Sequence, residues 1–511
     1  MLPDEVLTRF YREKVNRQEK ITFFSSLVFG FASHLFMLVN KLPNYDDIHC
    51  LLDDYGSGIE VGRWMLFILG NIVRKTIGSV SIPWLNGLIC IIILSITAAV
   101  IVHILEFKSN VLCCMIGAVI ISFPAVTGTL FFMYTAVYYC TAALCMVLAV
   151  LAIKNDQGKG MFIAVFWIAA GIGIYQAYFA WAVSFTLIWL LSEGLKDSSD
   201  AQRILKLGIK SLVTLLIGLI AYLIGVRFFL AVKGVELSGY QNLDQMTKLD
   251  PSIILGQILY AYRAYIALFF KDVAGINTIW ILKAVFLTLH IIVFILLVLC
   301  LKKKNQKYVV MEVIGIAAIF PIAVNLIYII GVGSHVYTIM MFSVVSIYLL
   351  LGTVMNHSDV RGKVAAAGTW GGLCLLFMAA VCQIQYSNVQ YLILNMQYEQ
   401  AVSYFTTMVS QIKLLDGYDP ALKLAFIGSD IKDPSFTYNK EFSSYPIGGR
   451  GEDLINVYSR EDFLKRYLGY DQEILSDYSY LEASKDVQDM PSYPASGSLK
   501  IVDDIIVIKL D

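Results

Sequence analysis

The sequence predicts a polytopic α-helical membrane protein with about 11 transmembrane helices and a small C-terminal extracytoplasmic α/β domain. Of its 511 residues, 58% are hydrophobic and 15% are charged, whereas soluble proteins average about 25% charged residues. Apolar runs long enough to cross a bilayer recur through most of the chain. From Tyr386 onward, 11 Lys and Arg stand against 19 Asp and Glu, so a basic membrane part precedes an acidic tail.

Residues 1–20 form a basic head, expected in the cytoplasm. It carries Arg9, Arg12, Lys14, Arg17 and Lys20. The apolar segment that follows lacks a small-residue cleavage site, so we interpret it as a retained signal anchor. The basic run at 302–307 is the strongest signal for a cytoplasmic turn by the positive-inside rule.

The transmembrane domain is expected at 21–385. Its eleven expected spans are roughly 21–39, 83–105, 111–124, 130–153, 161–174, 177–191, 204–232, 279–301, 308–330, 336–355 and 364–383. Outer loops at 41–81 and 233–278 each contain a helix with the pattern of an interfacial helix. An odd number of spans places the domain at 386–511 outside, with helical spacing at 387–415, a strand at 423–428 and one or two strands at 498–510.

Several common chemistries lack their motifs. The sequence has no P-loop, no Gly-rich dinucleotide fingerprint, no H-E-x-x-H and no G-x-S-x-G. None of the nine cysteines follows Tyr386 and no C-x-x-C occurs, which disfavours a thiol-based metal site. No nucleic-acid partner is predicted. If the protein uses a sugar donor outside the cytoplasm, where nucleotides are scarce, we expect a polyprenyl-phosphate sugar rather than a nucleotide sugar.

The candidate catalytic residues are Asp46 and Asp47, in the first outer loop. A carboxylate can deprotonate a sugar hydroxyl as it attacks an anomeric carbon, and charge beside lipid is costly unless it is used or paired. Adjacent side chains in a turn point in different directions, so one could be the base and the other structural; the sequence leaves the choice open. The alternative is a solvated turn. Asp53 and Asp54 are expected to be loop or helix-start residues.

The candidate phosphate-binding residues are Arg63, Arg263 and His335. The guanidinium of Arg63 is a forked donor suited to a phosphate, and the neighbouring Trp64 offers a flat surface to a sugar. A snorkelling arginine beside an interfacial tryptophan is the alternative. Arg263 lies among tyrosines in the second outer loop, where it could equally meet lipid head groups, and His335 could equally be a helix-end residue.

Tyr175 and Gln176 form a polar outer hairpin. Both are candidate sugar-binding residues, and a simple turn is the alternative. Together with the apolar first span, the Tyr45-Asp46-Asp47 element and Gly62-Arg63-Trp64, this order of elements resembles the Gtr-type (GtrII-like) bacterial integral membrane glucosyltransferases, which belong to the GT-C class.

The resemblance implies transfer of a glucosyl or related hexosyl unit from an undecaprenyl-phosphate-linked sugar to a cell-surface polysaccharide such as an O-antigen. It places the reaction at the outer face of the bacterial inner (cytoplasmic) membrane. It also implies inversion with Asp46 or Asp47 as base, and Arg63, with Arg263 or His335, stabilising the departing lipid phosphate. No cofactor or metal is required, although the acidic cluster is compatible with a divalent cation.

Two other functions compete with this interpretation. A polysaccharide flippase or transporter would place charged residues deep within spans and often has repeated halves. A membrane acyltransferase would need a buried catalytic histidine with a partner, and neither His34 nor His103 has an evident one. Neither feature stands out in the sequence.

Overall fold

The computed structural model describes residues 4–5, 12–13, 15–51, 58–78, 81–156, 158–239, 251–331, 333–428 and 454–510. Asp53 and Asp54 therefore lie outside the described residues. The chain forms two compact units, one of Met1–Val39 with Asp54–Val389 and one of Asn40–Asp53 with Gln390–Asp511. The second unit thus combines part of the expected first outer loop with the C-terminal region.

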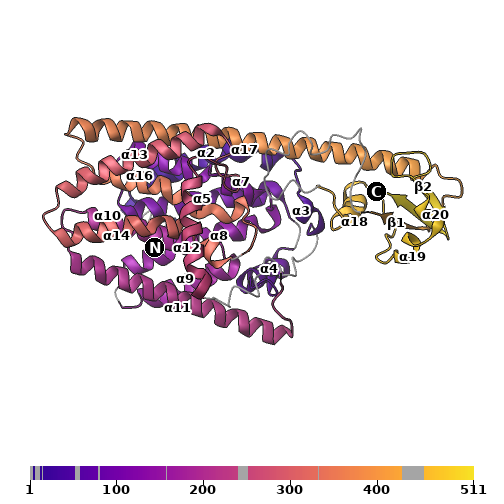
Figure 1. The fold of residues 1–511 in the computed structure, drawn as a ribbon, viewed down its shortest axis with the longest axis horizontal. Helices are drawn as coiled ribbons and strands as arrows, with labels where there is room; N and C mark the ends of the chain where they lie inside the picture. Colours follow the sequence, from indigo (N-terminus) through magenta and orange to yellow (C-terminus); the bar gives the residue numbers. More distant parts are fainter. Residues whose placement is uncertain are drawn as a thin grey trace. The chain divides into compact units, whose positions relative to one another are not determined.

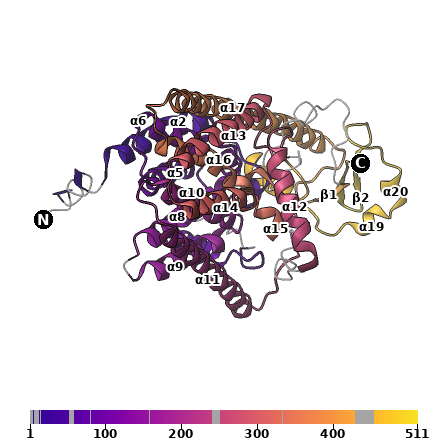
Figure 2. The same ribbon diagram turned by 60° about the vertical axis from the view of Figure 1, so that its left-hand side comes forward.

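The first unit is a bundle of helices (Figure 1). Its elements are α2 (Arg17–Val39), α4 (Trp64–Thr76), α5 (Pro83–Leu105), α6 (Asn110–Ile121), α7 (Pro124–Leu130), α8 (Met133–Lys154), α9 (Gly160–Ile174), α10 (Tyr178–Leu195), α11 (Ala201–Lys233), α12 (Pro251–Ala267), α13 (Trp280–Lys302), α14 (Lys307–Val324), α15 (Ile327–Ile330), η3 (Thr338–Val345), α16 (Ser346–His357) and the first part of α17 (Lys363–Ile412). Figure 2 shows α12 beside α15, and these two helices pack together.

Local signals in the sequence set the ends of these helices. The side chains of Ser109 and Asp200 accept hydrogen bonds from backbone N–H groups at the starts of α6 and α11, which satisfies donors that a helix start leaves without partners. Proline occupies the first turn of α5, where its missing N–H costs nothing. Gly234 ends α11 in the left-handed conformation, as glycine does readily.

Within the described residues, nine helices are long and apolar enough to cross a membrane, or ten if the bent pair α6 and α7 forms one span. The bend between α6 and α7 is 43°, and it falls at Pro124, which cannot continue a helix. Helix α9 is apolar but only 15 residues long. These helices indicate a multi-pass membrane protein; the expected count of eleven stays a prediction.

Helix α17 differs from expectation in being continuous. A span at 364–383 and a separate helix at 387–415 were expected, yet α17 runs without a break for 50 residues. From 373 to 412 the chain contains neither glycine nor proline, the residues that most often end a helix. One helix therefore contributes residues to both units.

Close helix packing and buried polar pairs hold the first unit together. A Cβ on Gly30 of α2 would lie 2.9 Å from Cγ2 of Ile91 on α5, so a larger residue would force the side chains at this close crossing to shift. The amide of Gln383 accepts from Ser122 Oγ and donates to Tyr348 Oη, both over 3.0 Å. This buried amide has one partner at the end of α6 and one on α16, and it therefore fixes the positions of these helices relative to α17.

The second unit contains a three-stranded sheet in the order β1-β3-β2. Strand β1 (Lys423–Ile427) is parallel to β3 (Ile505–Lys509), and β2 (Leu499–Val502) is antiparallel to β3. The strands expected at 423–428 and 498–510 are therefore confirmed. Asp503 and Asp504 link β2 to β3 with positive φ at both residues, as a two-residue type I′ turn requires.

Short helices complete this second unit. They are α3 (Tyr45–His49), α18 (Arg460–Asp462), the π-helical turn η4 (Phe463–Tyr467), α19 (Ser479–Glu482) and α20 (Lys485–Gln488). A core that includes Ala425 of β1, Leu481 of α19 and Val507 of β3 joins the sheet to the helices. Burial of these apolar side chains on one face of a sheet is what stabilises so small a unit.

Candidate active site

A glycine turn presents Arg63 in the first unit. Gly62 has φ of +75°, and its N–H donates to the Ile59 carbonyl over 2.9 Å. A Cβ at this position would lie 2.8 Å from Tyr222 Oη and 3.0 Å from Gln176 Nε2. Both the backbone conformation and the lack of space therefore require glycine immediately before the arginine.

Two tyrosine rings hold the guanidinium of Arg63. Its Nη1 donates to Tyr139 Oη over 3.0 Å, and its Cζ lies 4.9 Å from the centre of the Tyr175 ring. The rings of Tyr139 and Tyr175 are stacked, with centroids 4.4 Å apart, and both residues are buried. The cation–π contact and the hydrogen bond fix the orientation of a charge that is itself half-buried.

Trp64 is wedged between α9 and α11. Its Nε1 donates to the Tyr222 carbonyl over 3.3 Å, and its ring stacks on Phe229 at 5.7 Å and 7°. A Cβ on Gly173 or Gly225 would approach the indole to 2.8 or 2.6 Å. The indole thus anchors the start of α4, and the expectation that it also contacts sugar stays a prediction.

Gln176 binds the turn that precedes Arg63. Its Nε2 donates to the Val61 carbonyl over 2.6 Å and to Tyr222 Oη over 3.2 Å. The amide donors therefore hold the Gly62 turn against α11. The structure brings Arg63, Trp64, Tyr175 and Gln176 into one cluster, while a role in sugar binding stays a prediction for Tyr175 and Gln176.

The acidic pair lies in α3, in the second unit. Asp47 is 5% exposed and forms a capping box with Asn44: the Asp47 N–H donates to Asn44 Oδ1 over 2.8 Å, and the Asn44 N–H donates to Asp47 Oδ2 over 3.5 Å. Asp46 is half-buried, and its carbonyl accepts from the Cys50 N–H over 2.8 Å. The two adjacent carboxylates therefore have different surroundings.

Residues of the C-terminal region hold the end of α3. Nδ1 of His49 lies 2.8 Å from Asp462 Oδ2, and Arg466 Nη1 donates to the His49 carbonyl over 2.9 Å. Arg466 Nη2 and Asp462 Oδ1 are 3.2 Å apart. We call His49, Asp462 and Arg466 the His49 network.

Arg263 and His335 lie on other elements of the first unit. Arg263 is exposed on α12, a helix that packs against α14 and α15. His335 precedes η3, and its ring meets the edge of the Tyr337 ring at 4.6 Å. The interactions that build the Arg63 cluster come instead from α4, α8, α9 and α11, so a phosphate-binding role for Arg263 and His335 stays a prediction.

A family model described as glucosyl transferase GtrII matches residues 35–348. This chain belongs to the GtrII glucosyl transferase family. The resemblance inferred from the motifs is thereby confirmed, and the protein is a membrane glycosyltransferase that uses a sugar donor and an acceptor at a lipid bilayer. No curated protein and no solved structure matches the chain.

The GtrII match contains every candidate site residue and ends before the C-terminal region. Asp46, Asp47, Arg63 and His335 are among the matched residues, whereas Asp462 and Arg466 lie beyond them. The partners that the motifs did not indicate are Tyr139 and Tyr222 for the Arg63 cluster, and Asp462 and Arg466 for α3. Tyr139 and Tyr222 carry no local signal, because they are two of 30 tyrosines and sit within apolar helices.

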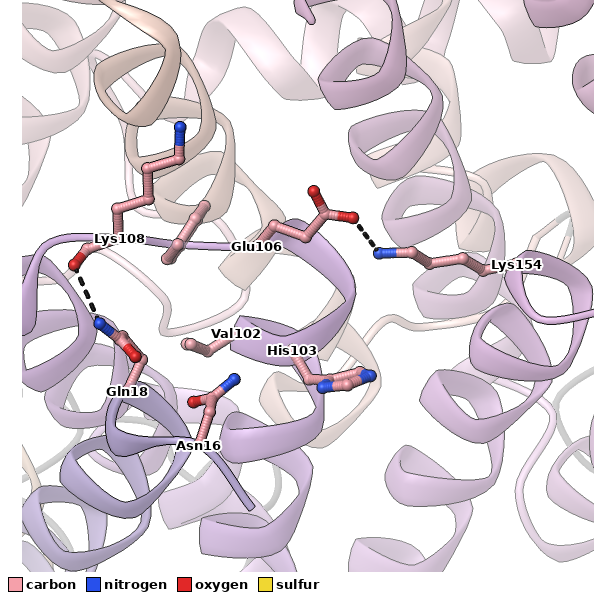
Figure 3. A pocket seen from close by; sticks show the side chains of 8 residues that line it. Asn16, Gln18, Val102, His103, Glu106, Lys108 and Lys154 are labelled. Carbon is pink, nitrogen blue, oxygen red and sulfur yellow. Dashed lines mark hydrogen bonds and ion pairs between the residues drawn. The ribbon is translucent and has the colours of Figure 1, made fainter. Parts of the chain in front are cut away.

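A pocket of about 530 Å³ lies at the other end of α8 from the Arg63 cluster and includes Gln18, Val102, His103, Glu106, Lys108 and Lys154 in its lining (Figure 3). Lys154 is 15 residues from Tyr139 along α8, about 22 Å of helix. Glu106 pairs with Lys154 at 2.7 Å and with Lys196 at 3.0 Å. Although burial raises its pKa, these two lysines lower it below the ordinary value, which makes Glu106 a poor base.

His103, which also lines this pocket, pairs with Glu19. Nδ1 of His103 lies 2.7 Å from Glu19 Oε1, so this histidine has a partner that the sequence did not suggest. Among the residues that the structure describes, no group of three or more His, Cys, Asp or Glu side chains could hold a metal ion.

Proposed function

We propose that this GtrII-family enzyme transfers a glucosyl or related hexosyl unit from a polyprenyl-phosphate sugar, with undecaprenyl phosphate as the lipid, to a cell-surface polysaccharide. The reaction takes place at the outer face of the cytoplasmic membrane, with the N-terminus in the cytoplasm and the C-terminal region outside. It inverts the anomeric carbon in a single displacement, as in GT-C enzymes. Family membership supports transfer over the flippase and acyltransferase alternatives.

The single observation that carries the proposal is the placement of Arg63. Its guanidinium is held by Tyr139 and Tyr175 at the start of α4. The neighbouring helices α8 and α11 are long and apolar enough to cross a bilayer. A forked cation held beside such helices suits a phosphate whose polyprenyl tail remains in the membrane. Arg63 then stabilises the negative charge that develops on the lipid phosphate as the glycosidic bond breaks.

We assign the role of general base to Asp46 rather than Asp47. The Asp47 carboxylate is buried and is used in the capping box, whereas Asp46 is half-buried on the same turn. The acceptor hydroxyl attacks the anomeric carbon while Asp46 takes its proton, and the lipid phosphate leaves with the electron pair of the broken bond. The charge balance of this scheme requires no cofactor or divalent cation.

The test uses membranes containing the full-length enzyme, radiolabelled undecaprenyl-phosphate glucose and candidate acceptor glycans. Wild type should transfer label to the glycan, and Asp46→Asn should lower kcat by about 10²- to 10⁴-fold, the usual contribution of a general base. A nucleotide-sugar donor supplied without lipid should give no transfer. Normal transfer by Asp46→Asn would remove Asp46 from the mechanism, and use of the nucleotide sugar alone would contradict the proposed donor.

A further inference from the structure

The His49 network joins two segments that lie more than 400 residues apart in sequence. Asp462 uses both carboxylate oxygens, one toward His49 Nδ1 and one toward Arg466 Nη2. A carboxylate oxygen accepts hydrogen bonds, so the tautomer that completes this pair is the one with a proton on Nδ1 of His49. Arg466 then closes the ring by donating to the His49 carbonyl.

The carbonyl bound by Arg466 belongs to the last residue of α3. The final carbonyls of a helix have no partner within it, so a guanidinium there acts as a cap supplied by a distant part of the chain. Asp462 and Arg466 are only 17% and 18% exposed. Hydrogen bonds to a charged group are stronger where water is partly excluded, which applies to the pair of Asp462 and Arg466, whereas the His49 side chain is 39% exposed.

Two tyrosines extend the attachment of the same segment. The Tyr458 ring lies 4.0 Å from the His49 ring, and Lys41 Nζ lies 4.2 Å from the centre of the Tyr467 ring. Burial together with neighbouring Cys50 and Asp46 raises the pKa of Tyr458, and burial together with Asp47 raises the pKa of Tyr467. Both hydroxyls are therefore protonated at neutral pH and lie near the acidic pair.

Asp46 is on the turn that this network holds. Residues three apart on a helix occupy one face, so Asp46 and His49 are neighbours on α3. The Asp46 carbonyl also accepts from the Cys50 N–H, the residue after His49. Movement of His49 would therefore move the backbone that carries the Asp46 carboxylate.

We propose that Asp462 and Arg466 are positioning residues that fix α3, and with it Asp46, so that the C-terminal region contributes to transfer although it lies outside the family match. The inference rests on the proposed role of Asp46. It concerns the chemical step, because a base displaced by about 1 Å can cost about 10²-fold in rate while donor binding continues. The network itself touches no reacting atom in this scheme.

The test measures kinetics and the accessibility of Cys50 in the full-length enzyme. Cys50 is 6% exposed and directly follows His49, so its alkylation rate, read by peptide mass spectrometry, reports detachment of α3. Asp462→Asn and Arg466→Lys should each lower kcat by about 10- to 100-fold with the donor KM changed by less than about twofold. Both should also speed alkylation of Cys50.

Two further variants make the result specific. His49→Asn combined with Asp462→Asn should be less damaging than the sum of the two single changes, because both remove the same hydrogen bond between His49 Nδ1 and Asp462 Oδ2. Lys465→Gln is the matched control: Lys465 lies in the same turn, η4, but pairs with the exposed Asp471 at 2.7 Å. It should leave kcat and Cys50 protection at wild-type values.

The outcomes separate this inference from the proposed function. Wild-type kcat with Cys50 still protected in Asp462→Asn and Arg466→Lys would overturn the positioning role, even if Asp46→Asn were inactive. An active Asp46→Asn would remove the base, and the alkylation rates would still decide whether the network holds α3. Equal loss of kcat in Lys465→Gln would assign the effect to general destabilisation of the unit and would also overturn the inference.

Discussion

Asn44 and Asp47 cap α3 reciprocally, each side chain accepting the backbone N–H of the other. This relationship distinguishes two adjacent carboxylates that the sequence could not tell apart. A capping box satisfies donors at the start of a helix, so the Asp47 carboxylate has a structural task. Asp46 is one residue away and is not part of the box.

Asp47→Ala is therefore expected to act through stability. Loss of the cap should cost about 1 kcal/mol, and Asn44→Ala should cost a similar amount because it removes the same box. The double variant should be little worse than either single variant. Thermal unfolding of the purified enzyme measures the first effect, and kcat should fall far less than in Asp46→Asn. An inactive Asp47→Ala beside an active Asn44→Ala would instead make Asp47 the base.

Arg63→Lys tests whether the forked guanidinium matters beyond its charge. Lysine keeps the charge but cannot offer two parallel N–H groups to a phosphate, so kcat should fall by about 10²-fold. Tyr139→Phe removes one hydrogen bond to Arg63 and should lower kcat by about five- to tenfold. Steady-state kinetics with the lipid donor measures both changes.

Arg74→Lys is the matched control for that experiment. Arg74 is exposed on α4, the helix that Arg63 precedes, and donates to Asn71 Oδ1 over 2.7 Å. Its replacement should leave transfer unchanged. If Arg63→Lys also transferred at the wild-type rate, the lipid phosphate would have to be stabilised by another group, with Arg263 and His335 the next candidates.

The bounds of several helices could be predicted closely from the sequence, because it contains both the apolar length and the local end signals. The span expected at 83–105 coincides with α5, which starts at Pro83 and ends where Glu106 turns into the left-handed conformation. The continuity of α17 was not predicted. Polar residues after position 383 suggested that the helix ends there, but the chain contains no helix-breaking residue at that point and the helix continues.

The site could be predicted in part. Arg63 and Asp46 stand out because charge is rare in this chain and both follow an apolar span. Their partners could not be found in the same way. Tyr139 and Tyr222 meet the site only through the packing of α8 and α11, and Asp462 meets His49 across 413 positions. Local patterns in one sequence carry no information on such contacts.

Gly62→Ala tests how tightly the turn before Arg63 is built. The methyl group would meet Tyr222 Oη and Gln176 Nε2, which are ends of side chains and can move, but only by breaking the hydrogen bonds that hold the turn. We expect kcat to fall by about tenfold, with a stability loss of about 1–2 kcal/mol for the positive φ. Kinetics and thermal unfolding together separate the two effects.

Gly234→Ala is the control for backbone strain alone. Gly234 has φ of +65°, and an added Cβ would meet no atom within 4 Å. This variant should lose similar stability and keep its transfer rate. Equal kinetics in the two alanine variants would mean that the close approach of Tyr222 and Gln176 to position 62 has no role in placing Arg63.

The Asp156 carboxylate, in the turn between α8 and α9, should make the stability of the protein depend on pH. A hydrogen bond from Lys210, then those from the N–H groups of Gly160 and Gly158, lower its pKa below the ordinary 3.8; the ion pair with Lys210 measures 2.7 Å. Because the pKa in the folded state is depressed, this stabilisation is present above the unfolded value and is lost as pH falls through the folded value. Thermal unfolding between about pH 6 and pH 3 should therefore show a smaller drop in Tm for Asp156→Asn than for wild type. Parallel curves for the two proteins would show that the pair with Lys210 contributes nothing to stability that depends on ionisation.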